Sequence, residues 1–547
     1  MSLKETFPSE IPATTREVVN RILPQNSVCR LLGEQGEKLI DEKALAEMYH
    51  REGRGGINPV MLSFVLILQF LENIPDRQAG LMAVMRLDWK YALRQDLTWA
   101  GFDYSNLCNF RKRLYTHGQE YLIFNQVIEY LKQAGYIQAK RQRTDATHVL
   151  GAIERMSRLE LVWESLRLAL VALINADARW VLDKLPVSFV SEHSEKQSDY
   201  RLSKAQIETA MVAAGRDGKW LLLQIETLGH ADWKQLPEIV TLARVLDEQF
   251  EPSDEGDGGL QAKSNQTACG DVIASPHDTS VRYSAKGRDT QWEGYKVQVT
   301  ETVDGDFPVI TDIGIHAAIE TDSSALDSIQ QRLAQRDLLP DQHYVDSAYV
   351  NGKTLYYSQQ RGIDLRGKLG AYSRKPLGFR LEDFHIHIET RTAICPQGKL
   401  ATVFNPSSQA DVAFHVRFGK QCLACPTNAL CTSDKRGRSL DLSPHHHLLT
   451  TRRQEQTTDS FSKEMYARSR IESTICELAC KHGLRQSRYR GQHKVDLQAA
   501  FTAVAINLKR LANYLVKQMD ILLTHLFTCL FIGRVFQQSH TGSPLVS

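Results

Sequence analysis

The pattern of apolar and polar positions separates stretches that favour helix from stretches that favour strand. Apolar residues recur at helical spacing over 42–50, 59–71, 78–85 and 121–134. The region up to residue 143 is therefore predicted to be mostly helical. The same periodicity returns between Gly151 and Phe250, where Leu159–Ile174 and Leu236–Phe250 form long runs. We expect this second region to be a helical insertion.

Alternating apolar and polar residues indicate strands farther along the chain. Tyr295–Val303 and Val309–Ile315 flank a Gly- and Pro-containing turn, which predicts a β-hairpin. The following segments are expected to be a helix capped by Thr321 (321–336), a strand (343–345), a helix (353–360) and a strand (363–369). A last helix carries Ile471, Ile475 and Leu478 on one face and ends at Gly483. This order fits a mixed sheet with helices on both faces.

Three carboxylates stand at informative places in this pattern. Asp145 follows the short extended stretch 137–144, and Asp346 ends the predicted strand 343–345, so both are expected where a strand runs into a loop. Glu472 lies on the rim of the apolar face of the last helix, with Arg468 one turn before it. Three carboxylates so placed can hold two Mg²⁺ or Mn²⁺ ions. The alternative for Glu472 is a solvated ion pair with Arg468.

Charge points to nucleic acid only through its distribution. The chain has 547 residues and a formal net charge of +2, so the total says little, but its length predicts several domains. From Thr451 to Lys517 there are thirteen Lys or Arg and six Asp or Glu. We expect Arg485, Arg488 and Arg490 in this segment to contact DNA. A helix opened by Ser105 as its cap carries Arg111, Lys112 and Arg113, which suit either phosphate contacts or an ordinary basic surface.

The apolar runs and the cysteines indicate in which cellular compartment the protein is expected. The runs 60–71 and 521–532 are shorter than the roughly 20 residues that span a bilayer, and residues 1–15 do not resemble a signal peptide. We therefore expect a cytoplasmic protein with no membrane partner. Ten cysteines in such a protein favour thiols or metal ligands over disulfides.

Four of these cysteines share one short segment. Cys395 stands in Cys-Pro-Gln-Gly, and Cys422, Cys425 and Cys431 follow within residues 371–450. Their number and spacing suit tetrahedral zinc, whereas the alternative is four unligated thiols in a loop-rich domain. We favour structural zinc, because so small a segment has few other sources of stability.

The order of these features resembles the DDE transposases of bacterial insertion sequences. The likeness extends from about Asp41 to Leu511 and is most specific in Trp292–Lys296, Val345–Tyr349 and Ile471–Arg490. It implies an RNase H-like catalytic core that cuts transposon ends and joins them to target DNA. Double-stranded DNA and a second copy of the chain are the partners that the resemblance implies, in the bacterial cytoplasm at the nucleoid.

The resemblance also implies a domain organisation for an α/β protein. A helical N-terminal DNA-binding domain and an interrupted mixed-sheet core are expected, with two insertions and a tail. The boundaries are 1–136 for the N-terminal domain, 137–150 with 285–370 and 455–517 for the RNase H-like core, 151–284 for the helical insertion and linker, 371–454 for the Cys-rich insertion and 518–547 for the tail. Within the helical insertion and linker, 251–259 is acidic and glycine-rich and is expected to be a linker.

Residue roles carried over from the family fall on matching positions. Asp145, Asp346 and Glu472 correspond to the metal-binding triad. Tyr466 and either Arg468 or Arg470 correspond to the family's Tyr and Arg, although the Tyr-to-Glu spacing is six here and is usually seven. The family's basic residue after the Glu falls on Ala479, and Lys481 is its nearest substitute. An inactive DNA-binding derivative and a nuclease that cuts without joining are the competing hypotheses.

Overall fold

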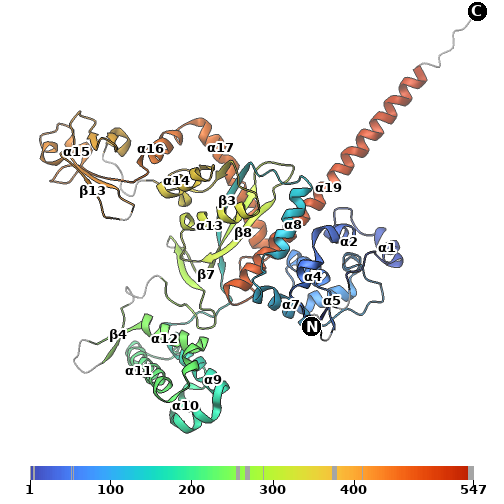
Figure 1. The fold of residues 1–547 in the computed structure, drawn as a ribbon, viewed down its shortest axis with the longest axis horizontal. Coiled ribbons are helices and arrows are strands. Elements are labelled where there is room, and N and C mark those ends of the chain that lie inside the picture. Colours follow the sequence, from blue (N-terminus) through green and yellow to red (C-terminus); the bar gives the residue numbers. More distant parts are fainter. Residues whose placement is uncertain are drawn as a thin grey trace, which may run out of the picture.

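The computed structural model describes residues 2–3, 6–50, 52, 55–253, 259–264, 271–287, 289–371, 378–409 and 411–539. It is a mixed α/β protein in which a central curled sheet is flanked by helices, with two further groups of elements at its periphery (Figure 1). A long last helix runs from the sheet past the N-terminal helices and out to the C-terminal end.

The central sheet has six strands, and its order places segments from far apart in the sequence side by side. The order is β10-β9-β3-β7-β6, with β8 also paired to β7. Its strands are β3 (Arg141–Leu150), β6 (Arg282–Lys286), β7 (Thr290–Thr302), β8 (Ile310–Ala317), β9 (Gln342–Tyr344) and β10 (Asp364–Arg366). Strands β3, β9 and β10 are parallel to one another, whereas β7 is antiparallel to β3 and to β8. The sheet is therefore mixed, as the sequence predicted.

The N-terminal helices pack on this sheet through a shared core. They are α1 (Ala13–Asn20), α2 (Val28–Leu39), α3 (Glu42–Ala46), α4 (Pro59–Glu72), α5 (Asp76–Met85), α6 (Leu87–Ala92), α7 (Ser105–Thr116) and α8 (Leu122–Gln133). Two short strands, β1 (Ser2–Leu3) and β2 (Gly55–Gly56), pair in parallel. The last helix, α19 (Gln492–Ser539), contacts α2, α4, α7, α8 and β8. One hydrophobic cluster thus joins the N-terminal helices, the sheet and the first part of α19.

The helical insertion has a hydrophobic cluster of its own. It comprises α9 (Arg158–Lys184), α10 (Val187–His193), α11 (Lys204–Leu228), the 3₁₀ turn η1 (Ala231–Gln235) and α12 (Pro237–Gln249). Side chains close the starts of α9 and α11, since Ser157 with Glu160 and Ser203 with Gln206 form capping boxes. The expected linker begins instead as a hairpin in which β4 (Phe250–Pro252) pairs with β5 (Leu260–Ala262). Residues 254–258 of that linker lie outside the described residues.

The Cys-rich region consists of small sheets with few buried apolar residues. Its elements are η3 (Leu381–Asp383), β11 (His385–His387), β12 (Thr392–Ile394), β13 (Val403–Pro406), β14 (Phe414–Arg417), η4 (Gly419–Cys422), α15 (Asn428–Cys431) and β15 (Ser439–Leu442). β11 pairs with β12, and β13, β14 and β15 form a three-stranded antiparallel sheet. The buried cluster has only six members: Phe384, Ala393, Val416, Phe418, Leu440 and Leu442.

The remaining helices lie before and after β10 in the sequence. The predicted helix 353–360 is α14 (Gly352–Gln360), and the predicted helix 321–336 is α13 (Asp322–Gln335), capped by Thr321. After the Cys-rich region come α16 (His446–Glu455), α17 (Asp459–Ser469), α18 (Ile471–Cys476) and a π-helical turn, η5 (Glu477–Lys481). Gly483 follows with φ of 73°, so it ends the helical stretch as predicted.

Two local expectations were wrong. Asp145 does not end a strand, because β3 continues for five residues beyond it to Leu150 and pairs with β7 along this length. Ser105 does not cap α7: it is the first residue of the helix, and its backbone N–H donates to the side chain of Asp103 at 2.9 Å. Pairing with β7 extends β3 past Asp145, and at the start of α7 it is Asp103, not Ser105, whose side chain accepts a backbone N–H.

Candidate active site

Strand pairing brings Asp145 and Asp346 to the same end of the sheet. Arg143 of β3 lies beside Tyr344 of β9 in parallel register, and each aspartate stands two residues farther along its strand direction. Asp346 leaves the sheet at this point and caps the 3₁₀ turn η2 (Ser347–Tyr349), where its carboxylate accepts the backbone N–H of Ser347. Both aspartates are partly exposed, so a ligand can reach them.

Arg468 connects Asp145 to Glu472. Its Nη1 lies 3.1 Å from Oδ2 of Asp145, and its Nη2 lies 3.4 Å from Oε1 of Glu472 one helical turn later. The Glu472 side chain is 67% exposed, whereas Arg468 and Asp145 are each 18% exposed. The solvated pair of Arg468 with Glu472 is therefore present, but its arginine also reaches the sheet. A single guanidinium thus lies between two of the three predicted carboxylates.

The electrostatic setting of Asp145 is that of a crowded acidic site. Burial raises the pKa of Asp145, and the nearby carboxylates of Asp346 and Asp322 raise it further, while Arg468 opposes them. Asp322 is the first residue of α13. Its Oδ1 accepts a hydrogen bond from Gln298 Nε2 at 3.1 Å and forms an ion pair with Lys296 Nζ at 3.1 Å. The position of Asp322 directly after a helix cap is ordinary for a helix start, so its closeness to Asp145 could not be predicted from the sequence.

The carboxylates suit a hard divalent cation, although they do not enclose one. Within the part of the chain that the structure describes, no three His, Cys, Asp or Glu side chains converge closely enough to hold a metal ion. The donor set is nevertheless all oxygen, as Mg²⁺ and Mn²⁺ prefer, and the positive guanidinium of Arg468 already lies against two of its members. The residues present therefore fit a cation at this end of the sheet.

The predicted accessory residues other than Arg468 are exposed on the helices that carry them. Tyr466 is 74% exposed on α17, and Arg470 is exposed at the junction between α17 and α18. Lys481 is exposed at the end of η5. Of the two arginines that could match the family's Arg, Arg468 is the one that contacts Asp145 and Glu472.

The three basic residues of α7 differ in whether they face the protein or the solvent. Arg111 is buried, pairs with Asp76 and lies over the ring of Tyr489. Arg113 donates to the carbonyl of Met48 at 2.8 Å, while Lys112 is exposed. Only Lys112 of the three is directed to solvent.

The arginines after Gly483 also make contacts within the protein. Arg485 donates to Thr147 Oγ1 at 3.0 Å and to His148, both on β3. Arg488 donates to the carbonyl of Ile74 at 2.8 Å. Arg490 is exposed and donates to the carbonyl of Ala152 at 3.0 Å. These contacts tie the segment after the π-helical turn to β3 and to the N-terminal helices.

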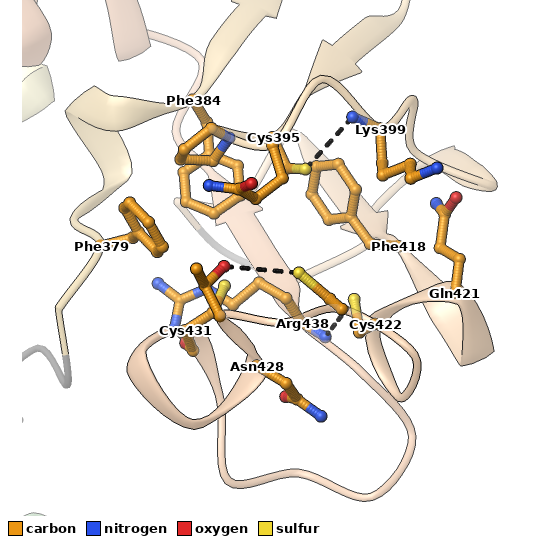
Figure 2. A pocket seen from close by; sticks show the side chains of 14 residues that line it. Phe379, Phe384, Cys395, Lys399, Phe418, Gln421, Cys422, Asn428, Cys431 and Arg438 are labelled. Carbon is orange, nitrogen blue, oxygen red and sulfur yellow. Dashed lines mark hydrogen bonds between the residues drawn. The ribbon is translucent and has the colours of Figure 1, made fainter.

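The four predicted zinc-binding cysteines line one pocket. Cys395 comes from the loop after β12, Cys422 ends η4, Cys431 ends α15, and Cys425 lies in the loop between η4 and α15. Figure 2 shows the sulfur atom of Cys395 and that of Cys422 on opposite sides of the pocket, with Phe418 beside Cys395. The cavity of about 20 Å³ has room for one water-sized particle.

Backbone N–H groups point at two of these sulfur atoms. The N–H of Lys399 donates to Cys395 Sγ at 3.3 Å, and that of Arg438 donates to Cys422 Sγ at 3.5 Å. A hydrogen bond with Thr427 lowers the pKa of Cys425, whereas burial raises the pKa of Cys431. All four are free thiols. Two backbone N–H groups thus point at sulfur, but within the described part of the chain the four side chains do not converge closely enough to hold a metal ion.

Two family models match the chain. A model described as "Transposase DDE domain" matches residues 394–512, and a model described as "Transposase domain (DUF772)" matches residues 17–113. The first match covers the Cys-rich region, Glu472 and the start of α19, and the second covers most of the N-terminal helices. No curated protein and no solved structure matches the chain.

Among the described helices, none by itself is long and apolar enough to cross a bilayer. The bent pair α4 and α5 reaches that length and apolarity together, but twelve of the fourteen residues of α4 are buried in the protein.

Proposed function

We propose, from the premise that the chain is a DDE transposase of the insertion-sequence type, that it binds the terminal repeats of an insertion sequence, cuts the DNA at these ends and joins them to target DNA. One observation carries this proposal. Asp145 and Asp346 each lie two residues beyond the paired residues Arg143 and Tyr344 at one end of the sheet, and Arg468 links Asp145 to Glu472 from a segment more than 100 residues away in the sequence.

An RNase H-like core is the fold that we propose for the catalytic part. It is supported by the strand order, in which an antiparallel run of β8, β7 and β3 continues into the parallel strands β9 and β10. In this arrangement the first carboxylate comes from the central strand β3, the second follows the adjacent parallel strand, and the third comes from a helix beyond the Cys-rich insertion.

The three carboxylates would hold Mg²⁺ or Mn²⁺. When bound, such ions activate an attacking water or 3′-hydroxyl and stabilise the leaving oxygen during phosphoryl transfer. Asp145 and Arg468 would influence how the metal and the DNA bind. Asp145 must be deprotonated to act as a ligand, and its raised pKa therefore weakens binding as the pH falls. The positive charge of Arg468 offsets the negative charges of Asp145 and Glu472 while no metal is bound. With a metal bound, its guanidinium would be available to contact a DNA phosphate.

Double-stranded DNA is the proposed partner, at both the transposon ends and the target. Lys112, Arg470, Lys481 and Arg490 are the exposed basic residues of the predicted set and are proposed to contact phosphates directly. Arg111, Arg113, Arg485 and Arg488 contact protein groups, so their proposed part in DNA binding is to shape the surface. A homodimer on DNA, in the bacterial cytoplasm, is proposed because two ends must be joined together.

Cleavage and joining of a duplex that carries the element's own ends, in Mn²⁺, tests this function. Asp346→Asn should give no cut and no joined product while binding the ends as the wild type does. Asp364→Asn is the matched control, because Asp364, at the start of β10, is likewise a partly exposed aspartate, on a strand of the central sheet. Binding without any cut by the wild type would favour an inactive derivative, and cutting without joining would favour a nuclease.

We further propose that Cys395, Cys422, Cys425 and Cys431 hold a structural Zn²⁺. The shared cavity, the free thiols and the two N–H donors support this, and the small buried cluster of the region leaves room for a metal to supply stability. Elemental analysis of the purified protein should find about one zinc per chain and a loss of it in Cys422→Ser. Cys108→Ser, a free thiol on α7, should keep its zinc.

A further inference from the structure

A fully buried carboxylate lies behind the candidate active site. Glu301, near the end of β7, is 0% exposed and faces Arg143, its register partner on β3. Arg143 Nε lies 2.7 Å from Glu301 Oε1, and the arginine side chain is only 5% exposed. A buried charge is costly unless it is paired and hydrogen-bonded, so the remaining oxygen of Glu301 requires partners as well.

The second oxygen of Glu301 holds two helices. Its Oε2 accepts the hydroxyl of Thr474 on α18 at 2.7 Å and Nη1 of Arg510 on α19 at 3.2 Å. Arg510 also donates from Nη2 to Thr474 Oγ1 at 2.7 Å and to Glu477 Oε2 at 3.3 Å. His482, whose Nε2 lies 3.8 Å from Glu477 Oε1, keeps the pKa of Glu477 well below its usual range together with Lys509 and Arg510. Both carboxylate oxygens of Glu301 therefore have hydrogen-bond partners.

Each branch of this network ends next to a residue of the candidate site. Arg143 lies two residues before Asp145 on the same face of β3. Its Nη1 donates to the carbonyl of Ala467 at 2.8 Å, directly before Arg468. Thr474 lies two residues after Glu472 on α18. One carboxylate thus connects the strand of Asp145 with the helix of Glu472.

We propose that Glu301 is a positioning residue that fixes α18 against β3, so that Glu472 and Asp145 are held at a set separation. This inference rests on the proposed function, in which those two carboxylates belong to one catalytic centre. Hydrophobic residues of similar volume often stabilise a core as well as a buried ion network does. The directional hydrogen bonds to Thr474 and Arg510 add what apolar packing lacks, a fixed angle between helix and sheet.

Thr474 is the place to test this link, because its hydroxyl can be removed without a change of shape. Thr474→Val removes the hydrogen bonds to Glu301 and Arg510, whereas Thr474→Ser keeps the hydroxyl. Thr241→Val on α12 is the matched control, since Thr241 is a nearly buried helical threonine whose hydroxyl bonds only the Pro237 carbonyl. Two quantities are measured: amide hydrogen exchange of peptides over 467–476, and single-turnover cleavage of a pre-bound DNA end at saturating Mn²⁺.

We expect Thr474→Val to exchange about tenfold faster over 467–476, with α13 unchanged, and to cut about tenfold more slowly at unchanged end affinity. Thr474→Ser should recover most of both quantities, and Thr241→Val should change neither. Unchanged exchange in Thr474→Val would overturn the proposal, and so would equal losses in Thr474→Ser. If the wild type does not cut, the proposed function fails, but the exchange comparison still decides whether Glu301 fixes the helix.

Discussion

The end of the central sheet that carries Asp145 and Asp346 (the sheet end) and the Cys-rich region position their candidate ligands in different ways. At the sheet end, carboxylates from segments far apart in the sequence are placed by strand register and by the buried charges of Arg143, Glu301 and Arg510. In the Cys-rich region, four thiols within 37 residues surround a small cavity beside only six buried apolar residues. At the sheet end the folded sheet positions the candidate ligands. In the Cys-rich region a bound metal is expected to stabilise the fold.

Removal of metal should separate the two regions most strongly. Structural zinc contributes roughly 10 kcal/mol or more in zinc-finger peptides at neutral pH. A strong chelator should therefore unfold residues 378–442 and leave the sheet folded. Hydrogen exchange before and after chelation measures this, with peptides of β3 and β7 as the internal control. Equal protection of residues 378–442 in both states would show that the thiols stabilise the region without metal.

Glu472→Gln should break the chemistry of the sheet end without breaking its fold. The side chain is 67% exposed, so the melting temperature should hardly change, while loss of a metal ligand should slow cleavage roughly 10³-fold, about 4 kcal/mol. Single-turnover cleavage gives the rate. Glu464→Gln on the preceding helix is the control, because this glutamate is also partly exposed and ion-paired, at 3.7 Å from Arg366. Similar rates for both variants would remove Glu472 from the site.

Arg143→Met should show how far the sheet end depends on buried charge. It leaves Glu301 without its cross-strand partner in the interior, and breaking a buried ion pair in this way costs roughly 3–5 kcal/mol. Arg141→Met on the same strand is the control, since its pair with Asp304 is at the surface and should be worth about 0–1 kcal/mol. Urea denaturation measures both. A loss of less than about 1 kcal/mol in Arg143→Met would contradict the role of the network.

Substitution of Asp496 is expected to have the smallest effect, a change in stability that depends on pH. Burial raises its pKa to about 6, although the hydroxyl of Tyr121 and the N–H of Ile315 donate to it. Because the folded pKa exceeds the unfolded value of about 3.9, the contribution of Asp496 to stability is full below pH 4 and falls as the pH rises to 6. Asp496→Asn should remove this slope and be up to about 3 kcal/mol more stable at pH 7. Denaturation at pH 4.5 and pH 7 tests it, and parallel slopes would contradict the raised pKa.

The sequence predicted the elements whose pattern is local. The hairpin of β7 and β8, the capped helix α13 and the helix end at Gly483 follow from alternation, a capping residue and a glycine with positive φ. The extent of β3 was not predictable, because the polar run Arg141–Ala146 is a strand only through its pairing with β7 and β9. Its buried polar residues are satisfied by side chains from other elements.

The candidate site was predictable in its members and not in its connections. Asp145, Asp346 and Glu472 could be chosen from motif and position, but their roles remain a prediction that activity must test. The contact of Arg468 with Asp145, the nearby Asp322 and the burial of Arg111 depend on helix packing. In α7, consecutive residues point about 100° apart, so three adjacent basic residues cannot all face DNA, and Arg111 is turned toward Asp76.

Exchange of an oxygen ligand for sulfur at Asp346 shows whether this residue binds the metal of a DNA-processing site. Cleavage of the element's ends by Asp346→Cys is compared in Mg²⁺ and in Mn²⁺, because thiolate is a poor ligand for Mg²⁺ and a better one for Mn²⁺. We predict no cleavage in Mg²⁺ and partial recovery in Mn²⁺. Cleavage in Mg²⁺ at the rate of the wild type would show that Asp346 does not bind the metal and would contradict the account.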